Sequence, residues 1–145
     1  MKRPICAQEA RQLNPVVLAF VGDAVYSLYV RERLVCDCEG TAADFQRTAA
    51  RVVSAEGQSR FLDELLPLFT EEENDIFRRG RNAKKATKSK HASVADYNRS
   101  TGFEAVLGYL YLTGNEARVR ELLANSLAED YEIKETVTAF KPVRR

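Results

Sequence analysis

Two carboxylates stand alone in apolar stretches of the sequence, where they could perform metal chemistry. Asp23 is the only charged residue from 15 to 30, and Glu104 is the only one from 101 to 115. An unpaired carboxylate in a buried helix costs several kcal/mol unless it is paired, hydrogen bonded or bound to a metal ion. Oxygen ligands without His or Cys suit Mg²⁺ or Mn²⁺. The two residues together favour a shared metal site.

Each carboxylate also has a structural explanation. Asp23 could pair with an arginine from another helix, and Glu104 lies three residues after Thr101, where it could complete a capping box. The thiols of Cys6, Cys36 and Cys38 lack the ligand spacing of a zinc site, and an odd cysteine count fits a reducing cytoplasm.

A concentrated basic segment lies between the two carboxylates. The whole chain has a formal net charge of +1, but residues 77–99 carry +7 and the remainder carries −6. Such a stripe is typical of a surface that binds a phosphate backbone, although it could also be a solvated loop. His91, the only histidine, is expected to contact phosphate rather than act as a general base. The candidate phosphate-binding residues are Arg78, Arg79, Arg81, Asn82, Lys84, Lys85, Lys88, Lys90 and His91.

A carboxylate pair beside a basic loop suggests metal-assisted hydrolysis of a phosphodiester. A cation on the two carboxylates would activate water and stabilise the developing charge. The basic loop would hold the backbone in register.

The elements that must position these residues are helices. The chain has 145 residues and ordinary globular composition, with no apolar run long enough for a spanning helix and no visible signal peptide. Capping residues and 3.6-residue periodicity predict helices, with a loop over 81–92. The predicted helices are 15–34, 41–55, 59–66, 70–80, one that contains 103–112 and begins near Ser93 or Thr101, and 116–128.

The predicted 15–34 helix is apolar around most of its circumference. Leu18, Val21, Val25 and Leu28 form a helical stripe, and further apolar residues widen it. A helix of this kind is expected to be buried on most faces, which a small monomer cannot easily achieve. The pattern therefore predicts a dimer.

Several segments resemble one enzyme family. Residues 18–26 (LAFVGDAVY) resemble the signature helix of the ribonuclease III endonuclease domain. Residues 79–84 (RGRNAK), followed by Tyr97, Ser100-Thr101 and 103–112 (FEAVLGYLYL), are similar to the Mini-ribonuclease III branch, the bacterial form without a double-stranded-RNA-binding domain. The resemblance covers residues 13 to 123.

The resemblance implies a fold and a set of site residues. It implies a dimer of chains, each with one ribonuclease III-type catalytic domain of about six helices over 1–145. The sequence pattern itself predicts one all-α domain, with a core over about 13–128 and a frayed C-terminal tail after Glu135. Asp23 and Glu104 match the two catalytic, metal-binding carboxylates. Two further carboxylates of long-form relatives are replaced by Ala19 and Thr101, as in the Mini branch. This leaves open the number of metal ions and a non-cleaving, ribonuclease III-like module that binds structured RNA.

The resemblance also implies an activity and its partners. We expect a Mg²⁺-dependent endoribonuclease, with Mn²⁺ as a substitute, that cuts both strands of double-stranded RNA to 5′-phosphate and 3′-hydroxyl ends. The expected substrate is the 23S ribosomal RNA precursor, which the basic residues 78–91 would contact. The expected partners are a second copy of the chain and, as a further candidate, a ribosomal protein that presents the substrate. The expected location is the cytoplasm, away from membranes.

Overall fold

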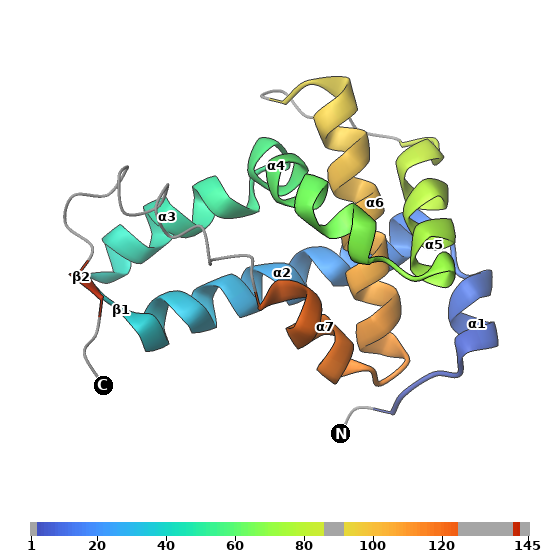
Figure 1. Cartoon of the computed structure of the whole chain (residues 1–145), viewed down its shortest axis with the longest axis horizontal. Helices are drawn as coiled ribbons and strands as arrows, with labels where there is room; N and C mark the ends of the chain where they lie inside the picture. The colour runs from blue at the N-terminus through green and yellow to red at the C-terminus, as the bar shows by residue number, and fades with distance from the viewer. Residues whose placement is uncertain (1–2, 86–91, 125–140, 143–145) are drawn as a thin grey trace.

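The chain folds as an assembly of helices, as the sequence predicts (Figure 1). The computed structural model describes residues 3–85, 92–124 and 141–142. In this part of the chain the only other elements are a 3₁₀ turn, η1 (Leu66–Leu68), and two short strands, β1 (Cys38–Glu39) and β2 (Lys141–Pro142), which pair antiparallel. The helices are α1 (Ala7–Gln12), α2 (Pro15–Asp37), α3 (Ala42–Val53), α4 (Ala55–Leu65), α5 (Glu71–Asn82), α6 (Val94–Leu112) and α7 (Glu116–Leu123).

Side-chain caps define where most of these helices begin. The Asn14 side chain accepts a hydrogen bond from the Val16 amide at 2.9 Å, and Thr41 and Thr70 form the predicted capping boxes. Ser54 ends α3 and caps α4 by accepting from the Gly57 amide at 3.1 Å. The predicted 41–55 helix is therefore too long and the predicted 59–66 helix starts too late, because Ser54 both ends the first helix and begins the second.

The end of α5 differs from the prediction, the start of α6 decides between the two predicted positions, and one further helix, α1, was not predicted. Gly80 does not end α5, which continues to Asn82, because a Cβ at Gly80 would lie only 2.9 Å from the Gly102 Cα on α6. The glycine permits close helix packing there. Ser93 caps α6, so this helix begins at the earlier of its two predicted sites. The short α1 was not predicted, since Cys6 provides no side-chain cap and only Ala10 is buried.

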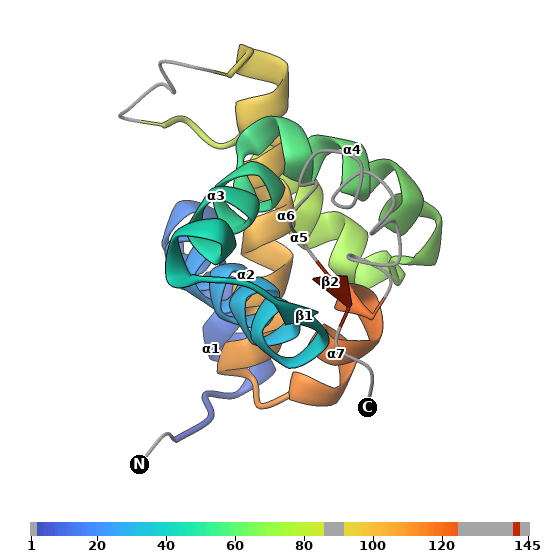
Figure 2. The same ribbon diagram turned by 90° about the vertical axis from the view of Figure 1, so that its left-hand side faces the viewer.

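Helix α6 passes through the middle of the molecule, with α2, α4 and α5 packed around it (Figure 2). The C-terminal half of α6 forms the centre of the apolar core, with buried apolar residues between Phe103 and Leu110. The Phe103 ring packs edge-to-face against Tyr26 of α2 and Phe61 of α4, with centroid separations of 5.2 and 6.0 Å. One aromatic cluster therefore joins the three helices that surround Glu104.

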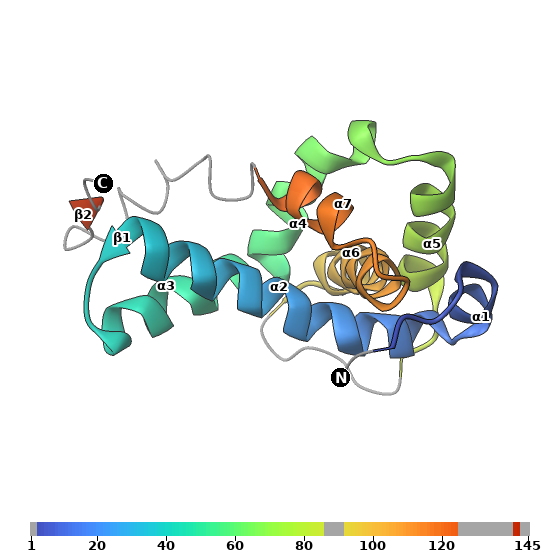
Figure 3. The ribbon, with the colours of Figure 1, turned by 90° about the horizontal axis from the view of Figure 1, so that it is seen from below.

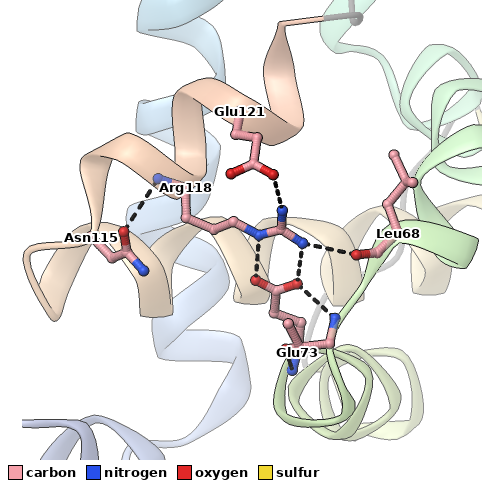
Figure 4. Close-up of polar contacts among 6 residues, drawn as sticks. Leu68, Glu73, Asn115, Arg118 and Glu121 are labelled. Atoms are coloured by element: carbon pink, nitrogen blue, oxygen red, sulfur yellow. Dashed lines mark hydrogen bonds and ion pairs between the residues drawn. The ribbon is translucent and has the colours of Figure 1, made fainter.

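A partly buried ion pair fastens α7 to α5 (Figure 4). The Arg118 guanidinium donates two hydrogen bonds of 2.9 Å to Glu73, one of 2.8 Å to the Leu68 carbonyl and one of 2.8 Å to Glu121. Burial alone would raise the pKa of Glu73, but hydrogen bonds from Arg118 and Thr70 outweigh it and lower the pKa. The buried Glu73 charge is thus compensated, and α7 is held in place.

The face of α2 that points away from the core is apolar and exposed. Phe20 is 80% exposed and Leu28 is 60% exposed, with Val17 and Val35 beside them on the same helix. Figure 3 shows α2 along one long side of the molecule, with α4, α6 and α7 on the same side of it. The expectation that this helix is buried on most faces is wrong within one chain, because no second layer of helices covers its outer face in the part of the chain that the structure describes.

Parts of the sequence prediction fall outside the described residues. These are the centre of the predicted 81–92 loop, the end of the predicted 116–128 helix and most of the C-terminal tail. Among the described residues, no helix combines the length and apolarity needed to cross a bilayer.

Candidate active site

Two glycines allow α2 and α6 to cross with their backbones in contact. A Cβ at Gly22 would lie 1.7 Å from the Glu104 carbonyl oxygen, and a Cβ at Gly108 would lie 1.9 Å from the Leu18 carbonyl oxygen. No side chain of any kind fits between the helices at these points. The crossing therefore places the residue that follows Gly22 on α2 next to the α6 residue whose backbone Gly22 contacts.

Those two residues are Asp23 and Glu104. The Asp23 and Glu104 side chains share a hydrogen bond, with Asp23 exposed and Glu104 half-buried. The structure thus brings together the two carboxylates that the sequence singled out. The structural explanation for Glu104 as a capping residue is excluded, because Thr101 lies inside α6 and its hydroxyl donates to the Tyr97 carbonyl at 2.9 Å.

The pKa of Glu104 is that of a buried carboxyl group with no compensating cation in the part of the chain that the structure describes. Burial and the charge of Asp23 raise the pKa of Glu104 from its ordinary 4.5 to about 8, and the hydrogen bond with Asp23 adds to the rise. A hydrogen bond with Gln58 acts in the opposite direction. A bound divalent cation would favour the ionised form of both carboxylates.

The raised pKa predicts how stability changes with pH in the chelator-treated protein. Between about 4.5 and 8, folded Glu104 holds a proton that the unfolded chain has released. The free energy of unfolding should therefore fall as pH rises through this window. Glu104→Gln should remove that contribution. Urea unfolding in EDTA at several pH values, with wild type and variant compared at each, measures the effect. A difference between the two proteins that stays constant from pH 5 to 8 would contradict the assignment.

The pair suits a cation that keeps most of its water. Mg²⁺ is commonly bound by one or two carboxylates together with substrate phosphates and water. Across residues 3–85, 92–124 and 141–142, no cluster of three or more His, Cys, Asp or Glu side chains could hold an ion. Ala19 and Thr101, where the resemblance implies that long-form relatives carry further carboxylates, are both buried in this structure. The donor chemistry fits Mg²⁺ or Mn²⁺ with two protein ligands.

Those candidate phosphate-binding residues that the structure describes lie at the C-terminal end of α5 and directly after it. Arg78, Arg81, Asn82 and Lys84 are exposed and Arg79 is half-buried, whereas Lys88, Lys90 and His91 lie outside the described residues. This end of α5 packs on α6 through Gly80 and Gly102, two residues before Glu104.

Lys85 differs from its neighbours. Its ammonium group donates to the carbonyls of Gly80, Arg81 and Ala83 at 3.0, 3.2 and 2.8 Å. These carbonyls lie at the C-terminal end of α5, where a helix leaves its last carbonyls short of backbone partners, and the Gly80 carbonyl also accepts a 3.4 Å hydrogen bond from the Ala83 amide. The ammonium group is thus engaged with the backbone in this structure.

Two buried polar residues beside Glu104 were not foreseen from the sequence. The Tyr26 hydroxyl has no hydrogen-bond partner among the described residues, and burial followed by the Glu104 charge raises its pKa. Gln58 is buried on α4 and contacts the Glu104 carboxyl group. Gln58 shares a helical stripe with Leu62 and Leu65, and this polar interruption of an apolar stripe is the signal that could have identified it.

Comparisons with known proteins identify the family of the chain. The family model described as Ribonuclease III domain matches residues 16–115. Mini-ribonuclease 3 of Symbiobacterium thermophilum is 48% identical over 111 residues, which are 77% of this chain and 85% of that protein. Mini-ribonuclease 3 of Brevibacillus brevis is 40% identical over 128 residues, 88% of this chain and 96% of that protein.

A solved structure shares the arrangement of helices. The crystal structure of a Fusobacterium nucleatum protein superimposes with a TM-score of 0.72 at 25% sequence identity, covering 79% of this chain and 93% of that one. With the family match over 16–115 and relatives above 40% identity across most of the chain, the protein belongs to the ribonuclease III family of endoribonucleases.

Proposed function

We propose that the chain is a Mg²⁺-dependent endoribonuclease that matures the 23S ribosomal RNA precursor in the cytoplasm. It cuts both strands of double-stranded RNA and leaves 5′-phosphate and 3′-hydroxyl ends, and Mn²⁺ can replace Mg²⁺. The observation that carries the proposal is the contact between Asp23 and Glu104 at the crossing of α2 and α6. Family membership supports the same reaction class.

The two carboxylates share one role in the proposed reaction but differ in exposure. Asp23 and Glu104 hold the cation, which when bound supplies an activated water and neutralises charge on the phosphodiester. Asp23 is exposed, so its carboxylate is open to the substrate side, whereas half-buried Glu104 is held within α6. Both must be ionised to bind the cation, so Glu104 has to release its proton as the cation enters.

One assay tests the proposed function directly. A labelled RNA duplex and the matching single strand are incubated with the protein in Mg²⁺ or in EDTA, and the ends of the products are determined. Cleavage of the duplex only in Mg²⁺, with 5′-phosphate ends, is the expected result. Binding without cleavage would favour the structured-RNA-binding module instead. The 23S precursor is then tested with and without ribosomal proteins, since one of them is a candidate for presenting the substrate.

The exposed end of α5 is the proposed contact with RNA. A-form duplexes display phosphates and 2′-hydroxyls but hide base edges in a deep, narrow groove. Arg78, Arg81 and Lys84 are exposed cations on one short stretch and can bind that backbone with little sequence preference. Arg79, Asn82, Lys88, Lys90 and His91 complete the proposed contact, and Lys85 joins it only if its ammonium group leaves the carbonyls at the end of α5.

Neutralising the exposed cations should weaken binding and reduce its dependence on salt. In a variant with Arg78→Gln, Arg81→Gln and Lys84→Gln, each lost phosphate contact should lower the slope of log K against log[salt] by up to about one unit, on the estimate for B-form DNA. Duplex titrations at several salt concentrations measure the slope. A control that removes equal charge elsewhere, with Arg31→Gln, Arg47→Gln and Arg120→Gln, should change it less. Equal slopes for the two triple variants would place the RNA contact away from α5.

The active form is proposed to be a homodimer joined through the exposed face of α2. Val17, Phe20, Leu28 and Val35 are large apolar residues that one chain leaves open to water on one helix. Burying such a face against its symmetry mate removes apolar surface from water on both copies.

A single charge on this face should separate the dimer without unfolding the chain. Phe20→Glu or Leu28→Glu would bury an unpaired carboxylate in the interface, which costs several kcal/mol and should weaken association about a hundredfold or more. In analytical ultracentrifugation the wild type should sediment as a dimer and either variant as the 16.4 kDa monomer. The matched control is Val94→Glu, because Val94 is 66% exposed and lies on α6 rather than α2. A wild type that sediments only as a 16.4 kDa species at micromolar concentration would disprove the dimer.

A further inference from the structure

Gln58 is a buried polar side chain in the first turns of α4, facing α6. It is 2% exposed, yet it lies on the face of α4 that carries the core residues Leu62 and Leu65. Its Nε2 donates a 2.8 Å hydrogen bond to the Val53 carbonyl, at the end of the preceding helix. This bond fixes the plane of the carboxamide.

The start of α4 is itself held against α6 by several contacts. Arg99 of α6 donates to the Ser59 hydroxyl at 2.8 Å and to the Ser59 carbonyl at 3.0 Å, and it also bonds to Asp63. Two residues along, the Phe61 ring packs on Phe103, the neighbour of Glu104. Figure 1 shows α4 crossing beside α6 in this region. The Gln58 carboxamide therefore has a fixed place relative to the carboxylate pair.

Only the nitrogen of the Gln58 carboxamide has hydrogen-bond partners among the described residues. Its Oε1 is buried and has no hydrogen-bond partner among the described residues, a cost that an apolar side chain of the same shape would avoid. The amide group, in contrast, donates to the Val53 carbonyl and also interacts with the Glu104 carboxyl group, whose ionised form it favours. A donor that is shared between a helix end and an active-site carboxylate is suited to orienting that carboxylate.

We propose that Gln58 is a positioning residue that holds the Glu104 carboxylate toward Asp23, so that one divalent cation can bind both. The inference rests on the proposed function, because it assumes that this pair holds a cation. Gln58 acts through Glu104 and does not itself contact the substrate. Removing a residue that hydrogen bonds to a metal ligand typically lowers metal affinity about 10–100-fold.

The test measures Mn²⁺ binding in the absence of RNA, by titration calorimetry on the full chain. Gln58→Met keeps the length of the side chain but removes the donor, so we expect affinity to fall about 10–100-fold with the melting temperature retained. Gln58→Glu adds a carboxylate beside the pair and should bind Mn²⁺ more tightly than Gln58→Met. Raised Mg²⁺ concentration should restore duplex cleavage by Gln58→Met, which a merely unstable protein would not show.

A matched control separates positioning from packing. Thr48 on α3 is equally buried and its hydroxyl also has no partner among the described residues, so Thr48→Val should leave Mn²⁺ affinity unchanged. Wild-type affinity in a folded Gln58→Met variant would overturn the positioning role alone. Should that variant not fold, Gln58→Leu removes the same donor, and wild-type affinity in a folded Gln58→Leu variant would overturn the positioning role equally. A wild type that binds no Mn²⁺ would overturn this inference together with the proposed cation site.

Discussion

Asp23→Asn and Glu104→Gln should each lower duplex cleavage about a thousandfold or more while the chain still folds and still binds RNA. Each change keeps the shape of the side chain and removes one anionic oxygen ligand. A bound cation contributes several kcal/mol to stabilising the transition state, and each 1.4 kcal/mol corresponds to a factor of ten in rate. Losing either ligand from a site with only two described carboxylates leaves one charged protein ligand.

The measurement pairs single-turnover cleavage with a gel shift on the same duplex. Glu104→Gln also removes the group whose pKa is raised by burial and by Asp23, so this variant should be at least as stable as the wild type in EDTA at pH 8. The matched control is Glu71→Gln, an exposed carboxylate on α5, which should cut at the wild-type rate. Cleavage near the wild-type rate by Asp23→Asn or Glu104→Gln would remove that residue from the active site.

The sequence predicts the helices well where a side chain begins them. Asn14, Thr41 and Thr70 cap their helices in the structure as predicted, because each cap depends on residues within three positions of it. The prediction fails at Ser54 and Gly80. Ser54 is both the end of one helix and the cap of the next, and Gly80 continues a helix because α6 packs against it. Whether a glycine ends a helix or permits close packing depends on residues far away in the chain.

The two carboxylates were predictable as residues, but their environment was not. A charge that is alone in an apolar helix is visible in the sequence, and both such residues meet in the structure. Their exposure differs, however, since Asp23 is exposed and only Glu104 is half-buried. The reason is that α2 turns one apolar face outward, with Phe20 80% exposed, and a helical pattern alone does not say whether the same chain covers that face.

Contacts that basic side chains make within the fold could not be predicted from the charge of the segment. Lys85 belongs to the basic segment by composition, but its ammonium group lies on the last carbonyls of α5. Arg99 belongs to the same segment and binds Ser59, 40 residues away. A charge count treats such residues as available for phosphate, whereas the fold engages them with its own backbone.

Gly22→Ala adds only one methyl group, but it should strongly lower the stability of the fold. Its Cβ would lie 1.7 Å from the Glu104 carbonyl oxygen, so α2 and α6 would have to move apart along the centre of the core. The clash is between a side-chain carbon and backbone, and no change of rotamer relieves it. Overpacking that displaces backbone costs a few kcal/mol, so we expect a loss of about 3 kcal/mol or more and a melting temperature roughly 10 °C lower.

The same displacement should separate the carboxylates, so cleavage by Gly22→Ala should stay low at temperatures where the variant is fully folded. Gly108→Ala, with its Cβ 1.9 Å from the Leu18 carbonyl oxygen, should behave alike, because Gly108 lies one helical turn after Glu104 and packs against the same helix. Gly40→Ala is the control, because Gly40 is exposed between β1 and α3 without a positive φ. It should change stability by less than about 1 kcal/mol. Thermal unfolding and cleavage measured together decide the point, since wild-type stability in Gly22→Ala would mean that the helices do not cross at this glycine.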